Sequence, residues 1–139
     1  MQVRNVMTKG AECVRPSNSL QEAAQKMKNQ DVGALPVCGN DRLVGLITDR
    51  DIAVRAVAEG CDPRTTTVKD VMTPDVLYCS EDQDVQEAAQ LMCEHQVRRL
   101  IVFNGDKWLV GIVSLGDLAV DAEDKKLAGM TLEQVSLPA

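Results

Sequence analysis

The stretch Gly45-Leu46-Ile47-Thr48-Asp49-Arg50-Asp51 recurs later in the chain as Gly111-Ile112-Val113-Ser114-Leu115-Gly116-Asp117. Both stretches run from an aliphatic segment into a hydroxyl residue that is followed, three positions later, by an aspartate. Further matches occur in the same order: Val6-Met7-Thr8 with Val71-Met72-Thr73, and Gln21-Glu22-Ala23-Ala24-Gln25 with Gln86-Glu87-Ala88-Ala89-Gln90. The matching segments follow the same order in both halves of the 139-residue chain, with a single inserted residue between them. This pattern indicates an internal repeat of two copies.

Each copy predicts the same order of helices and strands. In the first copy Ser19-Leu20-Gln21-Glu22 is typical of a capping box, and Asp84 begins the matching helix of the second copy. Around the first helix we expect, in the first copy, strands at 12–14, 34–37 and 43–47, a turn at 38–42, and a second helix from Asp49 to about Glu59 that stops at Gly60. In the second copy we expect strands at 76–78, 100–103 and 109–113, a turn at 104–107, and a second helix from Leu115.

The fold class that follows is α/β (α+β), with two β-α-β-β-α repeats. One unit of about 60 residues is marginal alone, because so short a chain buries too little apolar surface. Two copies can bury their sheets against each other, so we expect them packed sheet to sheet with pseudo-twofold symmetry and a cleft on the axis. The expected boundaries are 1–60 for repeat 1, 61–67 for a linker, 68–121 for repeat 2 and 122–139 for a C-terminal tail.

Composition and charge exclude several classes of function. The chain has only three aromatic residues (Tyr78, Phe103 and Trp108), so its core must be aliphatic and base stacking on aromatic rings is disfavoured. Its net charge of −6 and pI near 4.7 argue against a nucleic-acid polymer as partner. No apolar run approaches the roughly 18 residues that span a bilayer, and the N-terminus lacks a secretory signal. We therefore expect a cytoplasmic protein with no membrane partner.

The cysteines and the single histidine predict little chemistry. Five cysteines, widely spaced and without a C-x-x-C pair, suit a mostly reduced protein. Cys13 and Cys38 fall on strands that can be neighbours, so a disulfide between them is a possibility. His95 near Cys93 lacks metal-ligand spacing, and we expect no metal site. No nucleophile motif or phosphate-binding P-loop is present, so we expect no catalytic residues and no enzyme activity.

The two repeated turns are the best candidates for binding. As local structure, Thr48 with Asp51 and Ser114 with Asp117 each predict a capping box at a helix start. A helix start also presents free N–H groups that attract a phosphate, and an aspartate can accept ribose hydroxyls. The set occurs twice at matched positions, which supports a ribose-phosphate ligand more strongly than either turn alone would.

These residues resemble a tandem pair of cystathionine-β-synthase (CBS) domains, known as a Bateman module. The resemblance rests on the repeated Val-Met-Thr, on Gly33-Ala34-Leu35-Pro36-Val37, and on the two Gly-containing turns that end in Asp51 and Asp117, and it covers roughly residues 3–120. Among stand-alone modules, the first copy is similar to bacterial hypoxic-response-type CBS proteins. The resemblance implies an adenosine derivative (AMP, ADP, ATP, NAD or S-adenosylmethionine) bound in the cleft between the repeats. It also implies a homodimer, a regulatory role, and no required cofactor beyond such a ligand.

Carried onto this sequence, the resemblance assigns a role to each matching position. Asp51 and Asp117 would hold ribose hydroxyls, and Thr48 and Ser114 would meet the phosphate. The adenine slot would be lined by the backbone near Ala34, Leu35, Pro36 and Val37, and near Leu100 and Ile101 in the second copy. The basic residues expected near phosphate, or alternatively solvated at the surface, are Arg50, Arg98 and Arg99.

The copies differ in ways that bear on these roles. Ile101 stands where the first copy has Pro36, and Gly116 stands where it has Arg50. We therefore expect two unequal sites, of which the one with Thr48, Arg50 and Asp51 is the better formed.

Two other interpretations stay open. The turns could be capping boxes only, in a structural or interaction module without a ligand. Alternatively, the protein could be a redox- or metal-responsive stress protein that works through Cys13, Cys38 and His95. The sequence does not indicate which protein or process is regulated.

Overall fold

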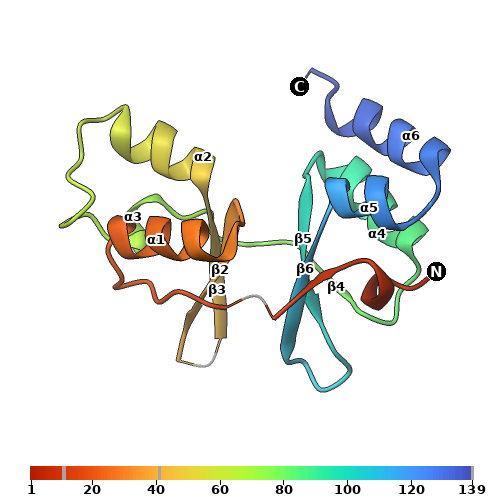
Figure 1. Ribbon diagram of the computed structural model, residues 1–139, viewed down its shortest axis with the longest axis horizontal. Coiled ribbons are helices and arrows are strands. Elements are labelled where there is room, and N and C mark those ends of the chain that lie inside the picture. Colours follow the sequence, from red (N-terminus) through yellow and green to blue (C-terminus); the bar gives the residue numbers. More distant parts are fainter. Residues whose placement is uncertain (11, 41, 139) are drawn as a thin grey trace. The chain divides into compact units, whose positions relative to one another are not determined.

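The computed structural model describes residues 1–10, 12–40 and 42–138. Asp41 of the expected turn and Ala139 of the expected tail lie outside the described residues. The chain forms two compact units: unit 1 comprises Met1–Ala11 and Leu77–Ala139, and unit 2 comprises Glu12–Val76. The N-terminal segment, red in Figure 1, is thus part of the same unit as the C-terminal half of the chain.

Unit 2 contains the first hairpin and its helices. Helix α1 (Leu20–Gln30) begins at the Ser19 capping box, as predicted, and β2 (Ala34–Gly39) pairs antiparallel with β3 (Arg42–Thr48). After Thr48 the chain makes α2 (Asp49–Asp51) and continues as a π-helix, η2 (Ile52–Val57). Gly60 follows with φ +75°, the left-handed conformation expected of a glycine that ends a helix. A short helix, α3 (Val68–Val71), completes the unit.

Unit 1 contains a larger sheet. Its strand order is β1 (Thr8–Lys9), β6 (Leu109–Ser114), β5 (Arg99–Phe103) and β4 (Tyr78–Ser80), of which only β4 and β5 run parallel. The helices are η1 (Val3–Asn5, a 3-10 helix), α4 (Val85–His95), α5 (Leu115–Asp121) and α6 (Lys125–Val135). The bulge between Val102 and Phe103 repeats the bulge between Val37 and Cys38, so the two hairpins match in detail.

Three local predictions need correction. The strand expected at 12–14 is reduced to a single bridge between Val14 and Val37, because only one residue reaches the edge of the hairpin. The strand expected at 76–78 begins two residues later, at Tyr78. The second helix of the first copy is mostly a π-helix instead of an α-helix.

The repeated Val-Met-Thr segments are exchanged between the repeats. Thr8 pairs with Ile112 of the second copy, whereas Thr73 pairs with Leu46 of the first. Each segment therefore precedes one repeat in sequence and packs on the other in space.

The exchange explains the two matched glycines. A Cβ at Gly111 would lie 2.5 Å from the carbonyl oxygen of Thr8, and one at Gly45 would lie 2.8 Å from the carbonyl oxygen of Thr73. Real Cβ atoms do not approach backbone this closely, so only glycine lets the exchanged segment lie flat on the strand.

Each unit has its own aliphatic core, as the composition predicts. In unit 2 the core gathers around Leu20, Leu35 and Ile47, and in unit 1 around Met92, Leu100 and Leu118. No aromatic residue is buried in the described part of the chain, and Tyr78 and Trp108 are exposed. None of the helices described here is both long and apolar enough to cross a membrane.

We predict that Gly111→Ala lowers the free energy of unfolding by about 1–3 kcal/mol, because the added methyl group forces the Thr8 backbone off its strand. Gly105→Ala is the matched control: a Cβ there meets no atom within 4 Å, so we expect a change within about 0.5 kcal/mol. Urea denaturation of the two variants measures both values. Equal stabilities would contradict the close packing of the exchanged segment.

Candidate functional site

Both repeated turns form the capping boxes that the sequence predicts. In the first, the Thr48 amide donates to Oδ2 of Asp51 and the Asp51 amide donates to Oγ1 of Thr48, both at 3.0 Å. In the second, the Ser114 amide donates to Oδ2 of Asp117 at 2.9 Å and the Asp117 amide donates to Oγ of Ser114 at 3.0 Å. Each hydroxyl accepts one bond and keeps its own O–H to donate.

Asp51 has two further neighbours that the sequence analysis did not assign. The Thr73 hydroxyl donates to Oδ1 and Oδ2 of Asp51 at 3.5 and 3.4 Å, and Nε of Arg55 lies 3.8 Å from Oδ1. Nη1 of Arg55 also donates to the carbonyl oxygens of Val71 and Met72. The exchanged Val71–Thr73 segment thus reaches the first turn. The signals for these residues were the repeat of Thr8 as Thr73 and the four-residue spacing of Asp51 and Arg55.

The other residues predicted for the first site lie on β2 and α2. Ala34, Leu35, Pro36 and Val37 are all buried, and Ala34 is the cross-strand partner of Thr48. The Asp49 amide donates to the carbonyl oxygen of Gly33 at 2.9 Å, which ties the start of α2 to the start of β2. Arg50 is exposed. The fold therefore brings the expected slot next to the turn, with Arg50 at the surface.

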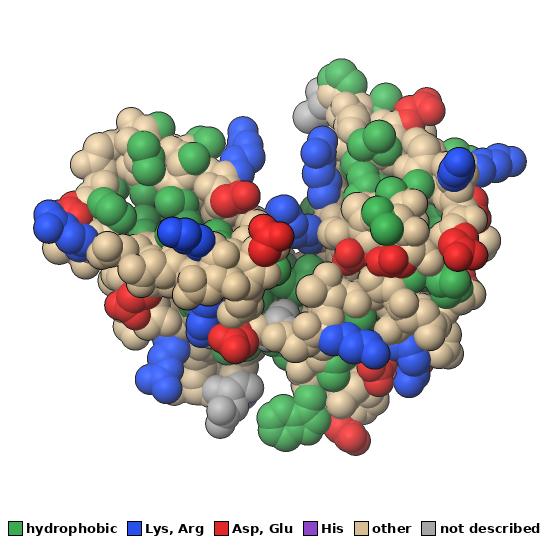
Figure 2. Space-filling view, viewed as in Figure 1, with side chains coloured by type: hydrophobic (Ala, Val, Ile, Leu, Met, Phe, Trp, Pro, Cys, Tyr) green, Lys and Arg blue, Asp and Glu red, His purple; other side chains and the backbone are tan. Residues whose placement is uncertain are grey.

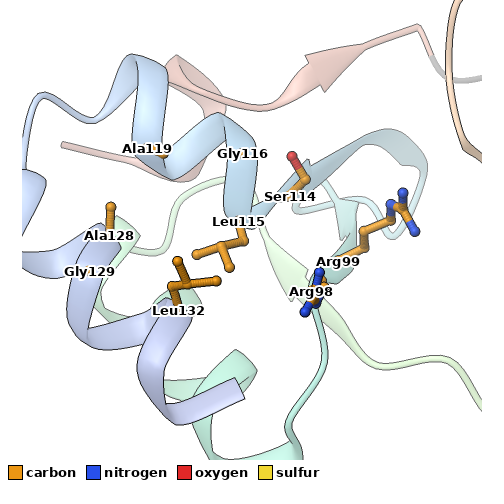
Figure 3. Close-up of a pocket in the computed structure, with 9 residues that line it drawn as sticks. All are labelled: Arg98, Arg99, Ser114, Leu115, Gly116, Ala119, Ala128, Gly129 and Leu132. Atoms are coloured by element: carbon orange, nitrogen blue, oxygen red, sulfur yellow. The ribbon is translucent and has the colours of Figure 1, made fainter. Parts of the chain in front are cut away.

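A pocket of about 510 Å³ lies within unit 1, beside the second turn (Figure 3). Three of the residues predicted for the site line it: Arg98, Arg99 and Ser114. The remaining lining residues come from α5 and α6, and they are Leu115, Gly116, Ala119, Ala128, Gly129 and Leu132. These six residues were not predicted to line a site. The three on α6 could not be, because the sequence does not indicate where α6 packs.

Figure 3 shows how the lining is divided. The side chains of Leu115 and Leu132 point toward each other on the helical side, and the arginines lie at the start of β5, with Ser114 at the junction of β6 and α5. Arg99 is the cross-strand partner of Ser114, and the Leu115 amide donates to the carbonyl oxygen of Arg98 at 2.9 Å. The pocket thus combines an apolar wall with two cations and a hydroxyl.

The other second-copy residues lie around this pocket, not in its lining. Leu100 and Ile101 are fully buried in β5, so only their backbone is available to a ligand. Asp117 is half-buried and is not among the described lining residues.

The two turns carry their cations on different elements. Arg98 and Arg99 stand where the first copy has Gly33 and Ala34. Conversely, the position of Arg55 is taken by Asp121 in the second copy. The first turn therefore meets positive charge from its helix, and the second from its strand.

Cys13 and Cys38 are neighbours, each a free thiol in the structure. Burial raises the pKa of Cys38 to about 12, and a hydrogen bond with the Cys13 thiol adds to the shift. In the second copy the matching positions hold Tyr78 and Phe103, whose rings meet edge to face at 5.4 Å. The same pair of positions is thus a dithiol in one repeat and an aromatic contact in the other.

The other residue considered for redox or metal chemistry is His95. His95 is an exposed residue at the end of α4 in unit 1, whereas Cys13 and Cys38 belong to unit 2. Within the described ranges no group of three or more His, Cys, Asp or Glu side chains could hold a metal ion.

We predict that Cys13 and Cys38 form a disulfide when the protein is treated with a small-molecule disulfide, which is reduced to two thiols in the exchange. A protonated thiol is a poor nucleophile, so raising the pH should speed the reaction. Mass spectrometry of the unreduced protein after digestion detects the linked peptides. Cys61→Ser should leave this link intact, and a full count of free thiols after oxidation at high pH would contradict it.

Comparison with protein families gives a clear match. The model of the CBS domain family matches residues 3–57 and 68–130, one match for each repeat. The CBS domain-containing protein YhcV of Bacillus subtilis is 42% identical over 134 residues, which cover 96% of this chain and 94% of that protein. Hypoxic response protein 1 of Mycobacterium tuberculosis is 43% identical over 117 residues, covering 84% of this chain and 81% of that protein.

Solved structures agree with the sequence comparison. A structure of Hypoxic Response Protein I with two coordinated zinc ions is 42% identical, covers 86% of this chain and 97% of the other, and has a TM-score of 0.73. The CBS domain pair of protein MJ0100, in complex with 5′-methylthioadenosine and S-adenosyl-L-methionine, is 28% identical, covers 86% and 93%, and has a TM-score of 0.75. With its two repeats matched by the family model and relatives of this identity along most of its length, the chain belongs to the CBS domain family.

Proposed function

We propose that this protein is a regulatory module of the cytoplasm that binds an adenosine derivative at its repeated turns and catalyses no reaction itself. The observation that carries the proposal is the pocket of about 510 Å³ in unit 1, which Arg98, Arg99 and Ser114 line. Ligand pockets for small molecules have volumes of about 300–1,000 Å³, so this one is large enough for a nucleotide.

The chemistry of the pocket suits a phosphate next to an apolar group. Two guanidinium groups can form charge-assisted hydrogen bonds with phosphate oxygens, and the Ser114 hydroxyl can donate another. The facing leucines offer apolar contact to a base or ribose. A ligand with a phosphate and an apolar group therefore finds partners on both the charged side and the apolar side of the pocket.

The aspartates keep acceptor capacity for a ribose. In each capping box the backbone amide is bonded to Oδ2, and Oδ1 is left for other partners. On Asp51 the contacts to Oδ1 are long, 3.5 Å from Thr73 and 3.8 Å from Arg55, so ribose hydroxyls could replace them at little cost. Capping and ligand binding are therefore compatible at one carboxylate.

The relatives support the same class of ligand. The related CBS domain pair of MJ0100 was solved with two adenosine derivatives, 5′-methylthioadenosine and S-adenosyl-L-methionine. Relatives within the family differ in their ligands, so the proposal specifies the adenosine class and leaves the member to experiment.

We further propose that the module is a homodimer. Val54 and Val57 on η2 are exposed, and so is Val120 on α5, which matches Val54 in the repeat. Aliphatic side chains exposed at matched positions of both repeats suit a symmetric contact with a second copy.

We predict that at least one of AMP, ADP, ATP, NAD and S-adenosylmethionine stabilises the protein, by about 2.7 kcal/mol at 100 times its Kd. Asp51→Asn and Asp117→Asn each keep an oxygen for the cap but lose the carboxylate. A hydrogen bond to a charged group contributes about 1.5–3 kcal/mol, so the double variant should bind at least about tenfold more weakly. Thermal denaturation with each ligand, followed by calorimetric titration, measures both effects.

Asp70→Asn is the matched control for the aspartate variants. Asp70 also stands three residues after a threonine at a helix start, where its Oδ2 accepts from the amide and the hydroxyl of Thr67 at 3.2 and 3.0 Å, but it lies outside the proposed sites. It should change stability without changing affinity. If no ligand in the panel stabilises the wild type, the proposal is wrong and the turns are capping boxes in an interaction module.

A further inference from the structure

The C-terminal helix α6 is a fixed part of unit 1. The Asp124 carboxylate accepts from the Leu127 amide at 2.9 Å and caps the helix. Thr131 and Val135 are buried, and Nε2 of Gln96 on the loop after α4 donates to the carbonyl oxygens of Gln134 and Leu137 at 3.2 and 3.0 Å. The segment that the sequence presented as a tail is therefore anchored at both ends.

One face of α6 forms a wall of the pocket beside Ser114. Ala128, Gly129 and Leu132 line the pocket together with Leu115 and Ala119 of α5 (Figure 3). The first repeat has no counterpart of this wall, because its second helix ends at Gly60 and the chain then enters the segment that leads to α3. The pocket in unit 1 thus has a boundary that is specific to the second repeat.

Gly129 is the unusual residue of this wall. Glycine in the interior of a helix costs stability relative to alanine, so its presence calls for a reason. It is not needed to avoid a clash, since a Cβ built at Gly129 meets no atom within 4 Å. Because Gly129 lines the pocket and its Cβ would meet open space, a longer side chain here has room to occupy part of the pocket.

The charges of the pocket lie opposite this wall. Arg98 and Arg99 come from the start of β5, and Ser114 from the end of β6. A molecule that fills the pocket therefore meets cations on the strand side and aliphatic carbon on the side of α6. Figure 2 shows Lys and Arg side chains at several separate places on the visible surface of unit 1, with Asp and Glu side chains between them.

We propose that α6 sets the specificity of the unit 1 site: its Ala128–Gly129 face admits the apolar part of a nucleoside phosphate whose phosphate binds Arg98 and Arg99. This inference rests on the proposed function and deepens it, because it assigns an orientation to the ligand and a role to the tail. Adenosine has no phosphate that could bind Arg98 and Arg99, so it binds this site more weakly than AMP.

The test is calorimetric titration of AMP and of adenosine into wild type and Gly129→Leu. The leucine fills the pocket while it improves the helix, so binding should fall at least tenfold while the thermal midpoint stays equal or rises. These two changes have opposite signs, which loss of folding cannot produce. Gly129→Gln is a second filling variant whose polar side chain tolerates solvent, and it should weaken AMP in the same way.

Gln134→Leu is the control, since it adds a leucine to α6 at an exposed position that does not line the pocket. It should bind AMP as the wild type does. If both Gly129 variants bind AMP as tightly as the wild type does, the role of α6 is overturned, and the proposed function is unaffected. Equal affinities of the wild type for AMP and adenosine would overturn the role of the arginines. A wild type that binds no adenosine derivative would remove the proposed function itself.

Discussion

The exchange of the Val-Met-Thr segments is the constraint on which the rest of the structure depends. Thr73 and Leu46 exchange two backbone hydrogen bonds, at 2.8 and 2.9 Å, across a bridge that leaves no room for a side chain at Gly45. This contact places the Thr73 hydroxyl where it donates to Asp51. It also places the carbonyl oxygens of Val71 and Met72 where they accept hydrogen bonds from Arg55. Unit 1 takes Met1–Ala11 from the far end of the sequence, whereas unit 2 includes, near its end, the Val71–Thr73 segment that precedes the second repeat. Neither repeat is therefore completed by its own residues alone.

Much of this fold could be predicted because it is decided by local sequence. The capping residues Ser19 and Thr48 give the starts of helices, and the aliphatic runs give the hairpins, since both signals act within a few residues. The exchange could not be predicted. Two copies of Val-Met-Thr show that the segment repeats, but which strand each one joins depends on contacts far apart in sequence.

The candidate site was predictable to a similar extent. Ser114 was expected from its position in the repeat and Arg99 from the resemblance to CBS domains, and the pairing of β5 with β6 brings them together. Thr73 and Arg55 were missed because they reach Asp51 through the exchanged segment and the π-helix. The wall from α6 was missed because residues beyond the repeat have no counterpart to compare with.

Duplication followed by divergence accounts for the differences between the halves. Both copies have the capping boxes, whereas the cations are Arg50 and Arg55 on the helix of the first copy and Arg98 and Arg99 at the start of β5 in the second. A protein of this kind can hold two similar turns that respond to different ligands, or to one ligand with different affinities. A sensor needs only that the ligand binds one state of the protein better than another.

Native mass spectrometry of freshly purified protein, before and after addition of excess AMP, ADP, ATP, NAD or S-adenosylmethionine, tests the central claim most directly. The account predicts the mass of a dimer that carries or takes up an adenosine derivative in fixed stoichiometry. A spectrum that stays free of ligand at every nucleotide concentration, whatever the oligomeric state, would contradict it.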